Sequence, residues 1–547
     1  FAIVTDRTGG HRPGIFEYGV TRLNLLQPEF VLSVGDLIEG YTEDTIELNR
    51  QWTEFNGFIN DLEMPFFYVA GNHDYTNQTM VNLWRSQFGV DYYSFVYKNV
   101  LFLCLNSEEG ATALKNPDFT DAQVEFVRKT LAEHPNVRWT LAFMHQPLWL
   151  RENAKNWLRV EDLLKDRKHT VFTGHFHQYA LHERNRSDYF VLATTGGGTP
   201  LRGKHRGEFD HIMWVTMTDK GPYYANILLD GIEGKDVAKA DKIAWLDQMD
   251  SKSPVKVIPV FYDANKMGAL TTKMTLKNEM QEVQQFDIQF ELNPTLNITQ
   301  SAIAKTLQPG QQEEIALNLT PTAKTDLKPL VANVLIKGKE FEWDNKMNLL
   351  PNQKFYVTKT KKGIKVDGDL KEWGELRFER KGETGDGNFR WDVREDANFL
   401  YVGIEVEDED YQVGFGTSSL QQDGAFFLFD ARPLEVSAFN RRDESGILRG
   451  EWGFLAASPT DENFELGFKE MLPPGVSGKG KRTRNGYTVE YAVPVALLNK
   501  MHGGDWKNAR LNVAVLDKDK DSKEAVQYYW MPDWSKDIPG SGTFFKE

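Results

Sequence analysis

The chain has 547 residues and a formal net charge of −15 at pH 7, and 40% of its residues are hydrophobic. One hydrophobic core does not grow to this size, so the length predicts several domains. The negative charge repels polyanions, which argues against sequence-independent nucleic-acid binding. The single cysteine, Cys104, excludes an internal disulfide. No apolar run approaches the roughly 20 residues that a transmembrane helix requires.

The first 250 residues alternate apolar runs with amphipathic stretches. The runs are FAIVTD (1–6), FVLSVGD (30–36), FFYVAGNHD (66–74), VLFLCLN (100–106), WTLAFMH (139–145) and TVFTGH (170–175). Thr120 precedes the helical pattern of residues 121–134 and is expected to be its N-cap. Strands that alternate with helices predict a layered α/β domain over residues 1–250. Because the sequence starts in a strand-like run without Met, residues are expected upstream of Phe1.

Two β-rich domains are expected after this α/β domain. Residues 251–355 contain alternating runs such as FDIQFELN (286–293) and EEIALNLT (313–320), separated by turns with Asn-Pro and Pro-Gly. Their spacing resembles that of an immunoglobulin-like β-sandwich. Residues 356–547 contain KVDGDLKEW (365–373), DANFLYVGIEVED (396–408) and GYTVEYAVPVALL (486–498), which predict a larger β-sandwich.

Polar side chains end most of the strand-like runs in the α/β domain. They are Asp6, Asp36, Asn72, His73, His145, His175 and His177. Because the carboxyl ends of neighbouring strands meet at one crevice, these residues are expected to surround one point. Taken singly, a Gly-Asp pair is usually a turn and a lone histidine is usually a buried core residue. Turn chemistry does not require all of them at successive strand ends, so a shared site is favoured.

These motifs resemble the calcineurin-like metallophosphoesterase family over roughly residues 1–215. The resemblance rests on GD (35–36), GNHD (71–74), His145 and GHFH (174–177), in this order. It implies a four-layer fold with two β-sheets flanked by helices and two metal ions at the strand ends. Asp36 would bridge the two ions, Asp6 and His177 would complete the first site, and Asn72, His145 and His175 the second. His73 would lie beside the phosphate, together with Asn72, and protonate or stabilise the leaving oxygen.

The types of ligand agree with this resemblance. Carboxylate, amide and imidazole groups without a thiolate suit Mn²⁺, Fe or Zn²⁺ better than a structural zinc site. Two such ions, about 3.5–4 Å apart, would share a bridging hydroxide and hold the phosphoryl oxygens during in-line attack. A histidine with an ordinary pKa near 6.5 is suited to act as the acid.

The first motif departs from the family pattern. The family usually has Asp-x-His, whereas this chain reads Asp6-Arg7-Thr8, so the first metal loses an imidazole. Thr8 could orient a water molecule, or His11 could replace the missing ligand. The Arg7 guanidinium could contact a substrate phosphate or form a surface salt bridge.

A second loop is expected over the site. The stretch TTGGGTPLRGKHRGEFDH (194–211) places Arg202, His205 and His211 where they could reach a substrate. The alternative is a solvated glycine-rich loop.

The C-terminal region resembles family 9 carbohydrate-binding modules over about 190 residues, through VDGDLKEW and DANFLYVGIEVED. Members hold sugars between aromatic rings, and some bind calcium. Trp530 and Trp534 are therefore candidate glycan-binding residues, with packing inside the sandwich as the alternative. Asp367, Asp369 and Asp408 could hold calcium or could be solvated turns.

The sequence thus predicts a metal-dependent hydrolase of phosphate mono- or diesters, directed to a glycan or cell-surface partner by its β domains. Appended sandwich modules favour a secreted, cell-surface or periplasmic setting by analogy. The first alternative is a binding or structural subunit that keeps the fold without turnover. Thr8 favours it, and the intact GNHD and GHFH motifs count against it. The second alternative is a protein whose main role is glycan binding.

Overall fold

The computed structural model describes most of the chain. The described residues are 1–109, 116–263, 268–322, 327–349, 351–360, 362–382, 387–410, 412, 422–434, 453–459, 464–466, 474–520, 525–531 and 542–547. Their contacts divide the chain into two compact units, Phe1–Ser251 and Lys252–Glu547. Among the described residues, no helix is long and apolar enough to cross a membrane.

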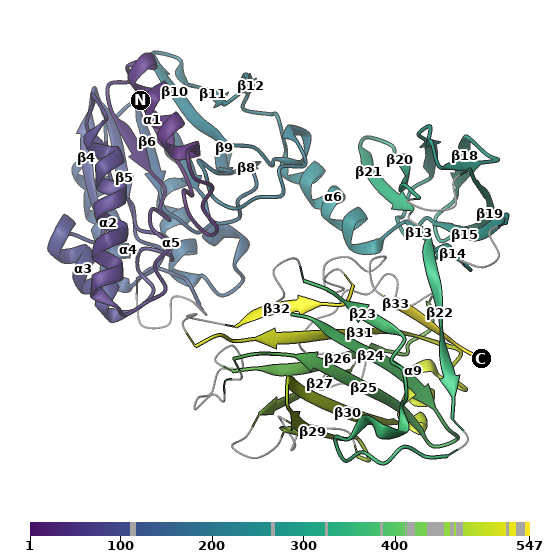
Figure 1. Ribbon diagram of the computed structural model, residues 1–547. Helices are drawn as coiled ribbons and strands as arrows, with labels where there is room; N and C mark the ends of the chain where they lie inside the picture. Colours follow the sequence, from purple (N-terminus) through teal and green to yellow (C-terminus); the bar gives the residue numbers. More distant parts are fainter. Residues whose placement is uncertain are drawn as a thin grey trace. The chain divides into compact units, whose positions relative to one another are not determined.

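The N-terminal unit contains two six-stranded sheets (Figure 1). The first has the order β12-β11-β10-β1-β2-β3, with β1 (Ala2–Val4), β2 (Val31–Ser33), β3 (Phe66–Phe67), β10 (His211–Thr218), β11 (Gly221–Leu228) and β12 (Ile232–Gly234). The second has the order β4-β5-β6-β7-β9-β8, with β4 (Tyr93–Tyr97), β5 (Val100–Cys104), β6 (Trp139–Phe143), β7 (His169–Thr173), β8 (Ala180–Arg184) and β9 (Ser187–Val191). The β1-β2-β3 and β5-β6-β7-β9 pairs are parallel, so their carboxyl ends share an edge.

Helices cover these sheets, as the alternating sequence pattern predicts. They are α1 (Ile15–Leu26), α2 (Thr45–Asn60), α3 (Gln78–Phe88), α4 (Asp121–Glu133), α5 (Lys155–Leu164) and α6 (Ala240–Lys252). Apolar faces of α1, α2 and α3 share one buried core with β1 and β2. The Thr120 side chain accepts a hydrogen bond from the Gln123 amide, which confirms the predicted N-cap of α4.

A row of phenylalanines fills the interior of the N-terminal unit. The rings of Phe102, Phe143, Phe172 and Phe190 stack in turn across β5, β6, β7 and β9. Phe1, which precedes β1, meets Phe102 and Phe143 edge-on at centroid distances of 5.3 and 6.3 Å. Phe1 therefore packs the start of β1, in the first sheet, against β5 and β6 of the second sheet. This contact holds the two sheets, and with them the strand ends that carry the polar residues, in a fixed relation to each other.

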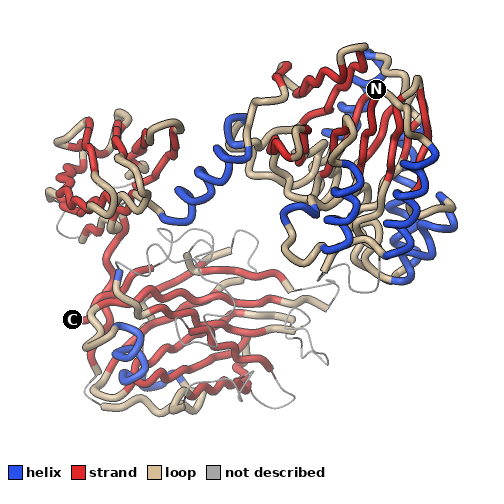
Figure 2. The backbone as a smooth tube through the Cα atoms, turned by 180° about the vertical axis from the view of Figure 1, so that it is seen from behind, coloured by secondary structure: helices blue, strands red, loops and turns tan. Residues whose placement is uncertain are grey.

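The C-terminal unit is built almost entirely of strands, whereas helices are concentrated in the N-terminal unit (Figure 2). Its first part holds two four-stranded sheets. Their strands are β13 (Val255–Val257), β15 (Leu270–Lys277), β16 (Gln284–Phe290), β17 (Leu296–Ile298), β18 (Ala302–Leu307), β19 (Gln312–Pro321), β20 (Leu330–Lys337) and β21 (Glu342–Leu349). Buried and exposed residues alternate along β15 and β16, which is the two-residue period of a strand with one face in a core. The immunoglobulin-like topology stays a prediction.

The second part forms a 13-stranded sheet. It comprises β14 (Phe261–Tyr262), β22 (Asn352–Lys359), β23 (Phe378–Arg380), β24 (Phe389–Glu395), β25 (Phe399–Glu407), β26 (Gly424–Asp430), β27 (Gly453–Pro459), β28 (Phe464–Leu466), β29 (Ser477–Thr483), β30 (Gly486–Pro494), β31 (Asn508–Asp517), β32 (Val526–Tyr529) and β33 (Gly542–Lys546). A helix, α9 (Val495–His502), follows β30. The expected boundary at 355/356 falls inside β22, which pairs with β33. The three-domain division stays a prediction.

Candidate metal centre

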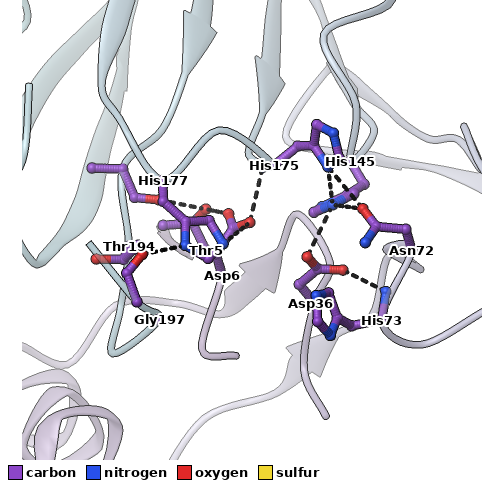
Figure 3. Close-up of polar contacts among 12 residues, drawn as sticks. Thr5, Asp6, Asp36, Asn72, His73, His145, His175, His177, Thr194 and Gly197 are labelled. Carbon is purple, nitrogen blue, oxygen red and sulfur yellow. Dashed lines mark hydrogen bonds and ion pairs between the residues drawn. The ribbon is translucent and has the colours of Figure 1, made fainter. Parts of the chain in front are cut away.

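Side chains that follow four strands of the N-terminal unit converge on one place (Figure 3). They form two groups, Asp36 with His145 and His175, and Asp6 with Asp36 and His177. Within each group, one nitrogen or oxygen atom of every residue lies within 4.8 Å of the others. Asp36 belongs to both groups, as a bridging carboxylate would.

Asn72 completes the group that contains His145 and His175. Its Oδ1 lies 2.9 Å from His145 Nε2 and 2.7 Å from His175 Nδ1. Its Nδ2 donates to the Tyr41 hydroxyl at 2.8 Å, which determines that the amide oxygen faces the imidazoles. This group therefore offers a carboxylate, an amide oxygen and two imidazoles.

Backbone carbonyls orient three of the histidine rings. His145 Nδ1 donates to Val34 O at 2.9 Å, His177 Nδ1 to Gly198 O at 2.5 Å, and His73 Nδ1 to Glu39 O at 2.7 Å. A ligating histidine commonly donates its other ring N–H in this way, which fixes the tautomer. Nε2 is then the ring atom turned toward the carboxylates, 3.2 Å from Asp36 Oδ2 for His145 and 3.3 Å from Asp6 Oδ1 for His177.

The backbone around the site adopts an uncommon conformation. Asp36, His175 and His177 have positive φ angles of 58°, 76° and 55°. Residues other than glycine seldom occupy this left-handed region, and each instance costs roughly 1–3 kcal/mol. The three turns therefore hold their side chains in place against a local energetic cost, which is typical of functional sites.

Glycines allow the loops to approach the carboxylates. A Cβ atom on Gly71 would lie 2.3 Å from Asp36 Oδ1, and one on Gly174 would lie 2.1 Å from Asp6 Oδ2. Both distances are far shorter than any real contact. The Gly of GNHD and the Gly of GHFH are thus required by close packing against the two buried carboxylates.

Asp74 binds the two ligand-bearing turns together. Its carboxylate accepts hydrogen bonds from the backbone amides of Asp36, Leu37 and Gly71 at 2.8, 2.8 and 2.9 Å. A further bond at 3.1 Å comes from Ile38. One buried side chain therefore sets the distance between the loop that carries Asp36 and the loop that carries Asn72.

The buried charges of the centre depend on one another. Burial opposes the charge of His145, but Asp36 beside it raises the pKa of the imidazole to about 10. Burial likewise opposes the charge of Asp6, yet the hydrogen bond from His177 lowers its pKa to about 2. Burial and the neighbouring His145 lower the pKa of His175 to about 3. Carboxylates, imidazoles and an amide oxygen, without a thiolate, form a donor set that fits divalent cations.

The missing imidazole at Thr8 has no substitute in these two groups. His11 is half-exposed, and its Nδ1 lies 2.9 Å from Glu39 Oε1. The Thr8 side chain is buried, and a Cβ on the adjacent Gly9 would lie 2.7 Å from His177 Cε1. The Asp6–Asp36–His177 group therefore offers three candidate ligands, whereas the other group, with Asn72, offers four.

The structure places Arg7 and Arg202 in ion pairs. The Arg7 guanidinium pairs with Glu54 of α2, and it also donates a hydrogen bond to Leu37 O at 3.1 Å. Arg202 binds Glu208 at 2.5 Å and Asp250 at 2.6 Å. For Arg7, this geometry is that of the salt-bridge alternative, and substrate contact by either arginine stays a prediction.

His205 and His211, the two histidines of the second loop, belong to neither of the two groups. His211 is buried, and its Nδ1 lies 2.8 Å from Asn226 Oδ1. His205 belongs to the short helix η2 (Lys204–Arg206). Among the residues of this loop, Gly198, Pro200 and Glu208 line a cavity of about 510 Å³ together with Asp36, Asn72, His73, His175 and His177.

Comparison with known proteins gives a family for this site. Residues 11–179 match the family model described as calcineurin-like phosphoesterase. The N-terminal domain is a calcineurin-like phosphoesterase domain. The match includes Asp36, Asn72, His73, His145, His175 and His177 and begins after Asp6.

Relatives of this phosphoesterase domain cover only part of the chain. The serine/threonine-protein phosphatase CPPED1 of Mus musculus is 28% identical over 211 residues, which are 34% of this chain and 66% of that protein. A dimetal phosphatase from Danio rerio has a TM-score of 0.31 and 13% identity, over 43% of this chain and 96% of the other. A family 9 carbohydrate-binding module from Caldicellulosiruptor kristjanssonii has a TM-score of 0.27 and 16% identity, over 36% of this chain and 93% of the module. The chain thus spans just under two thirds of the curated relatives that it matches.

Three residues near the phosphoesterase centre were not predicted from the sequence. Tyr41 orients Asn72, Arg151 contacts His175, and Glu108 lies buried beside Gln146. Burial raises the pKa of Glu108 to about 7. Glu108 and Arg151 lie in the loops after β5 and β6. In the sequence, the only feature that points to Glu108 and Arg151 is that they follow strands of the sheet whose ends carry the candidate ligands.

The candidate residues of the C-terminal unit lie apart from the phosphoesterase domain in sequence. The Trp530 ring packs against Trp391 and Phe355 at centroid distances of 4.9 and 5.1 Å, so its contacts are those of the packing alternative. Trp534 lies outside the described residues. Asp367 pairs with Lys365, and Asp369 pairs with Lys371. Calcium and glycan binding stay predictions.

Proposed function

We propose that the phosphoesterase domain hydrolyses phosphate esters with the help of two divalent cations. The main support is that six side chains converge into two groups that share Asp36. They are Asp6, Asp36, Asn72, His145, His175 and His177. One cation would be held by Asp6, Asp36 and His177, and the other by Asp36, Asn72, His145 and His175. Mn²⁺, Fe and Zn²⁺ all suit this donor set.

Two such cations would polarise the phosphoryl group and supply hydroxide near neutral pH. His73 supplies the proton for the leaving oxygen. Its backbone amide donates to Asp36 Oδ1 at 2.9 Å, and its Nδ1 donates to Glu39 O. The opposite ring nitrogen is then left for the substrate, in the cavity that His73 lines. A histidine held by its backbone amide and by one ring nitrogen can transfer a proton at a defined position.

The competing proposal is a binding subunit without turnover. It is favoured by Thr8, which leaves the Asp6 group with three protein ligands. A catalytic cation site, however, normally keeps open positions for water or substrate. Three protein ligands are therefore compatible with catalysis.

The deciding experiment combines metal content with hydrolysis of an aryl phosphate monoester and an aryl phosphate diester. We expect about two Mn²⁺ per chain and turnover that falls about 10²–10⁴-fold in His73→Ala, because a general acid is lost. The variant should keep its metal content. Two bound cations without turnover on either ester would favour the binding subunit.

We further propose that the C-terminal unit attaches the enzyme to a glycan or a protein partner outside the cytoplasm. The support is the sequence resemblance to family 9 carbohydrate-binding modules. Binding of the intact protein to soluble glycans, measured by calorimetry, tests this proposal. A panel without measurable heat at millimolar glycan would contradict glycan binding.

A further inference from the structure

Arg151 lies next to the metal centre, in the turn between the short helix η1 (Leu148–Leu150) and α5. Its Nη2 is 3.2 Å from His175 Nε2 and donates to Gln146 Oε1 at 2.9 Å. Its guanidinium carbon is 5.9 Å from the centre of the Phe176 ring. His175 and Phe176 both line the cavity of the centre. The guanidinium is therefore adjacent to the space that a substrate would occupy.

Arg151 differs from the other arginines around the centre in its partners. Arg7 pairs with Glu54, Arg12 with Asp210, and Arg202 with Glu208. Within the described part of the chain, Arg151 forms no ion pair, and its buried Nε–H has no hydrogen-bond partner. A guanidinium has five donors, and those left unsatisfied near a cavity favour an anion.

The contact between Arg151 and His175 depends on the state of the imidazole. His175 Nδ1 donates to Asn72 Oδ1, so Nε2 accepts from the guanidinium. If Nδ1 held a cation, the ring proton of the neutral imidazole would reside on Nε2. Two donors would then face each other, because Arg151 can only donate. The guanidinium would lose His175 as an acceptor and could turn to an anion.

We propose that Arg151 binds the phosphoryl group of the substrate and favours phosphate monoesters over diesters. This inference rests on the proposed function of the centre. A monoester dianion has three terminal oxygens and two charges, whereas a diester has two terminal oxygens and one charge. A guanidinium recognises two oxygens at once, and its attraction grows with the charge of the ester. The monoester therefore gains more from Arg151.

The test compares Arg151→Met with Arg159→Met in the intact protein loaded with Mn²⁺. Arg159 is an exposed arginine of α5 that pairs with Asp121, so its substitution matches the change in net charge. Binding of inorganic phosphate is measured by calorimetry, together with kcat/KM for an aryl monoester and an aryl diester. For Arg151→Met, phosphate affinity and monoester kcat/KM should both fall about 10- to 100-fold, as for loss of charge-assisted hydrogen bonds. Diester kcat/KM should fall less, and Arg159→Met should change none of the three.

The outcomes separate this inference from the proposed function. If Arg151→Met binds phosphate as tightly as Arg159→Met, Arg151 is not a phosphate ligand, whether or not the wild type turns over. Equal losses on the two esters overturn the preference for monoesters. If the wild type hydrolyses neither ester, the proposed function fails and phosphate binding alone decides about Arg151. If Arg151→Met loses its metal, Arg151→Lys is used, and unchanged phosphate affinity in that variant overturns the inference because a lysine lacks the planar fork.

Discussion

The Tyr41 hydroxyl determines which atom of Asn72 faces the two imidazoles of the proposed cation site. It accepts from Asn72 Nδ2 at 2.8 Å, so the amide oxygen points to His145 and His175. The Tyr41 ring also lies edge-on to the His73 ring at 4.6 Å between centroids. A residue outside the proposed ligand set thus positions both a proposed metal ligand and the proposed acid.

We predict that Tyr41→Phe weakens cation binding about 10- to 100-fold, as expected when a partner that orients a ligand is removed. Titration calorimetry with Mn²⁺ measures the change. Tyr18→Phe is the control, because Tyr18 is an exposed tyrosine whose hydroxyl bonds Arg22 on the surface of α1. Equal affinities in the two variants would contradict the role of Tyr41.

Cation binding should release protons from the centre. Asp36 raises the pKa of His145 to about 10 and Asp6 raises that of His177 to about 9, in each case against the effect of burial. Both rings are therefore protonated at neutral pH before a cation binds, whereas a ligating imidazole must be neutral. Affinity for Mn²⁺ should consequently increase as the pH rises from 6 toward 9. Calorimetry in two buffers with different ionisation enthalpies checks this, and identical heats would contradict it.

The sequence predicted which residues converge because their position is set by strand ends, and their role as cation ligands stays a proposal. Asp6 and Asp36 lie two and three residues after the short buried strands β1 and β2, and the topology alone brings such residues together. It could not show that Arg7 turns toward Glu54, because the direction of a long side chain depends on the helix packed beside it. Arg151 was missed for the same reason, since it reaches His175 from a turn with no motif of its own.

At the level of elements, Asp74 connects the turn after β2 with the turn after β3 through four backbone hydrogen bonds. We predict that Asp74→Asn lowers the free energy of unfolding by about 2–4 kcal/mol, because an amide offers one acceptor oxygen and leaves buried N–H groups unpaired. Urea unfolding with a chelator present measures this loss. Asp162→Asn, at an exposed position that pairs with Lys165, should change stability by less than about 0.5 kcal/mol. Equal effects in the two variants would contradict the prediction.

Gly174 packs against Asp6, so its substitution should affect one cation more than the other. A Cβ there would lie 2.1 Å from Asp6 Oδ2 and 2.9 Å from Thr5 Oγ1. We predict that Gly174→Ala displaces Asp6 and reduces the metal content from about two ions to about one, as measured by elemental analysis. Gly57→Ala, inside α2 with open space around it, should keep both ions and add about 0.5–1 kcal/mol of stability. Full metal content in Gly174→Ala would refute the steric argument.

Two properties of the elements could not be predicted from the sequence: the left-handed turns that carry the site residues and the pairing of β22 with β33. The left-handed φ angles of Asp36, His175 and His177 belong to residue types that adopt such angles only occasionally. The strand β22 pairs with β33 at the far end of the chain, so a boundary placed by composition at 355/356 divides one strand. Strand patterns show where strands lie, but partners distant in sequence are not encoded locally.

At the scale of the whole molecule, the chain consists of two compact units with separate cores. We predict two calorimetric unfolding transitions, of which Mn²⁺ shifts only the one that belongs to residues 1–251. At a concentration 1,000-fold above the dissociation constant, a bound ion adds about 4 kcal/mol to that unit. Asp36→Asn should lose most of the shift. A shift of both transitions by the same amount would contradict independent unfolding.

The two proposed metal-binding groups draw on residues from Asp6, just after β1, to His177 in the turn after β7. During synthesis, neither complete group exists until that turn has emerged from the ribosome. The remaining residues, which include the entire C-terminal unit, then require on the order of a minute at ordinary rates of chain growth. The phosphoesterase domain therefore has time to fold, and to take up the proposed cations, while the C-terminal unit is still being made. Metal supply at the site of translation, or immediately after folding, would set how much of the protein is active.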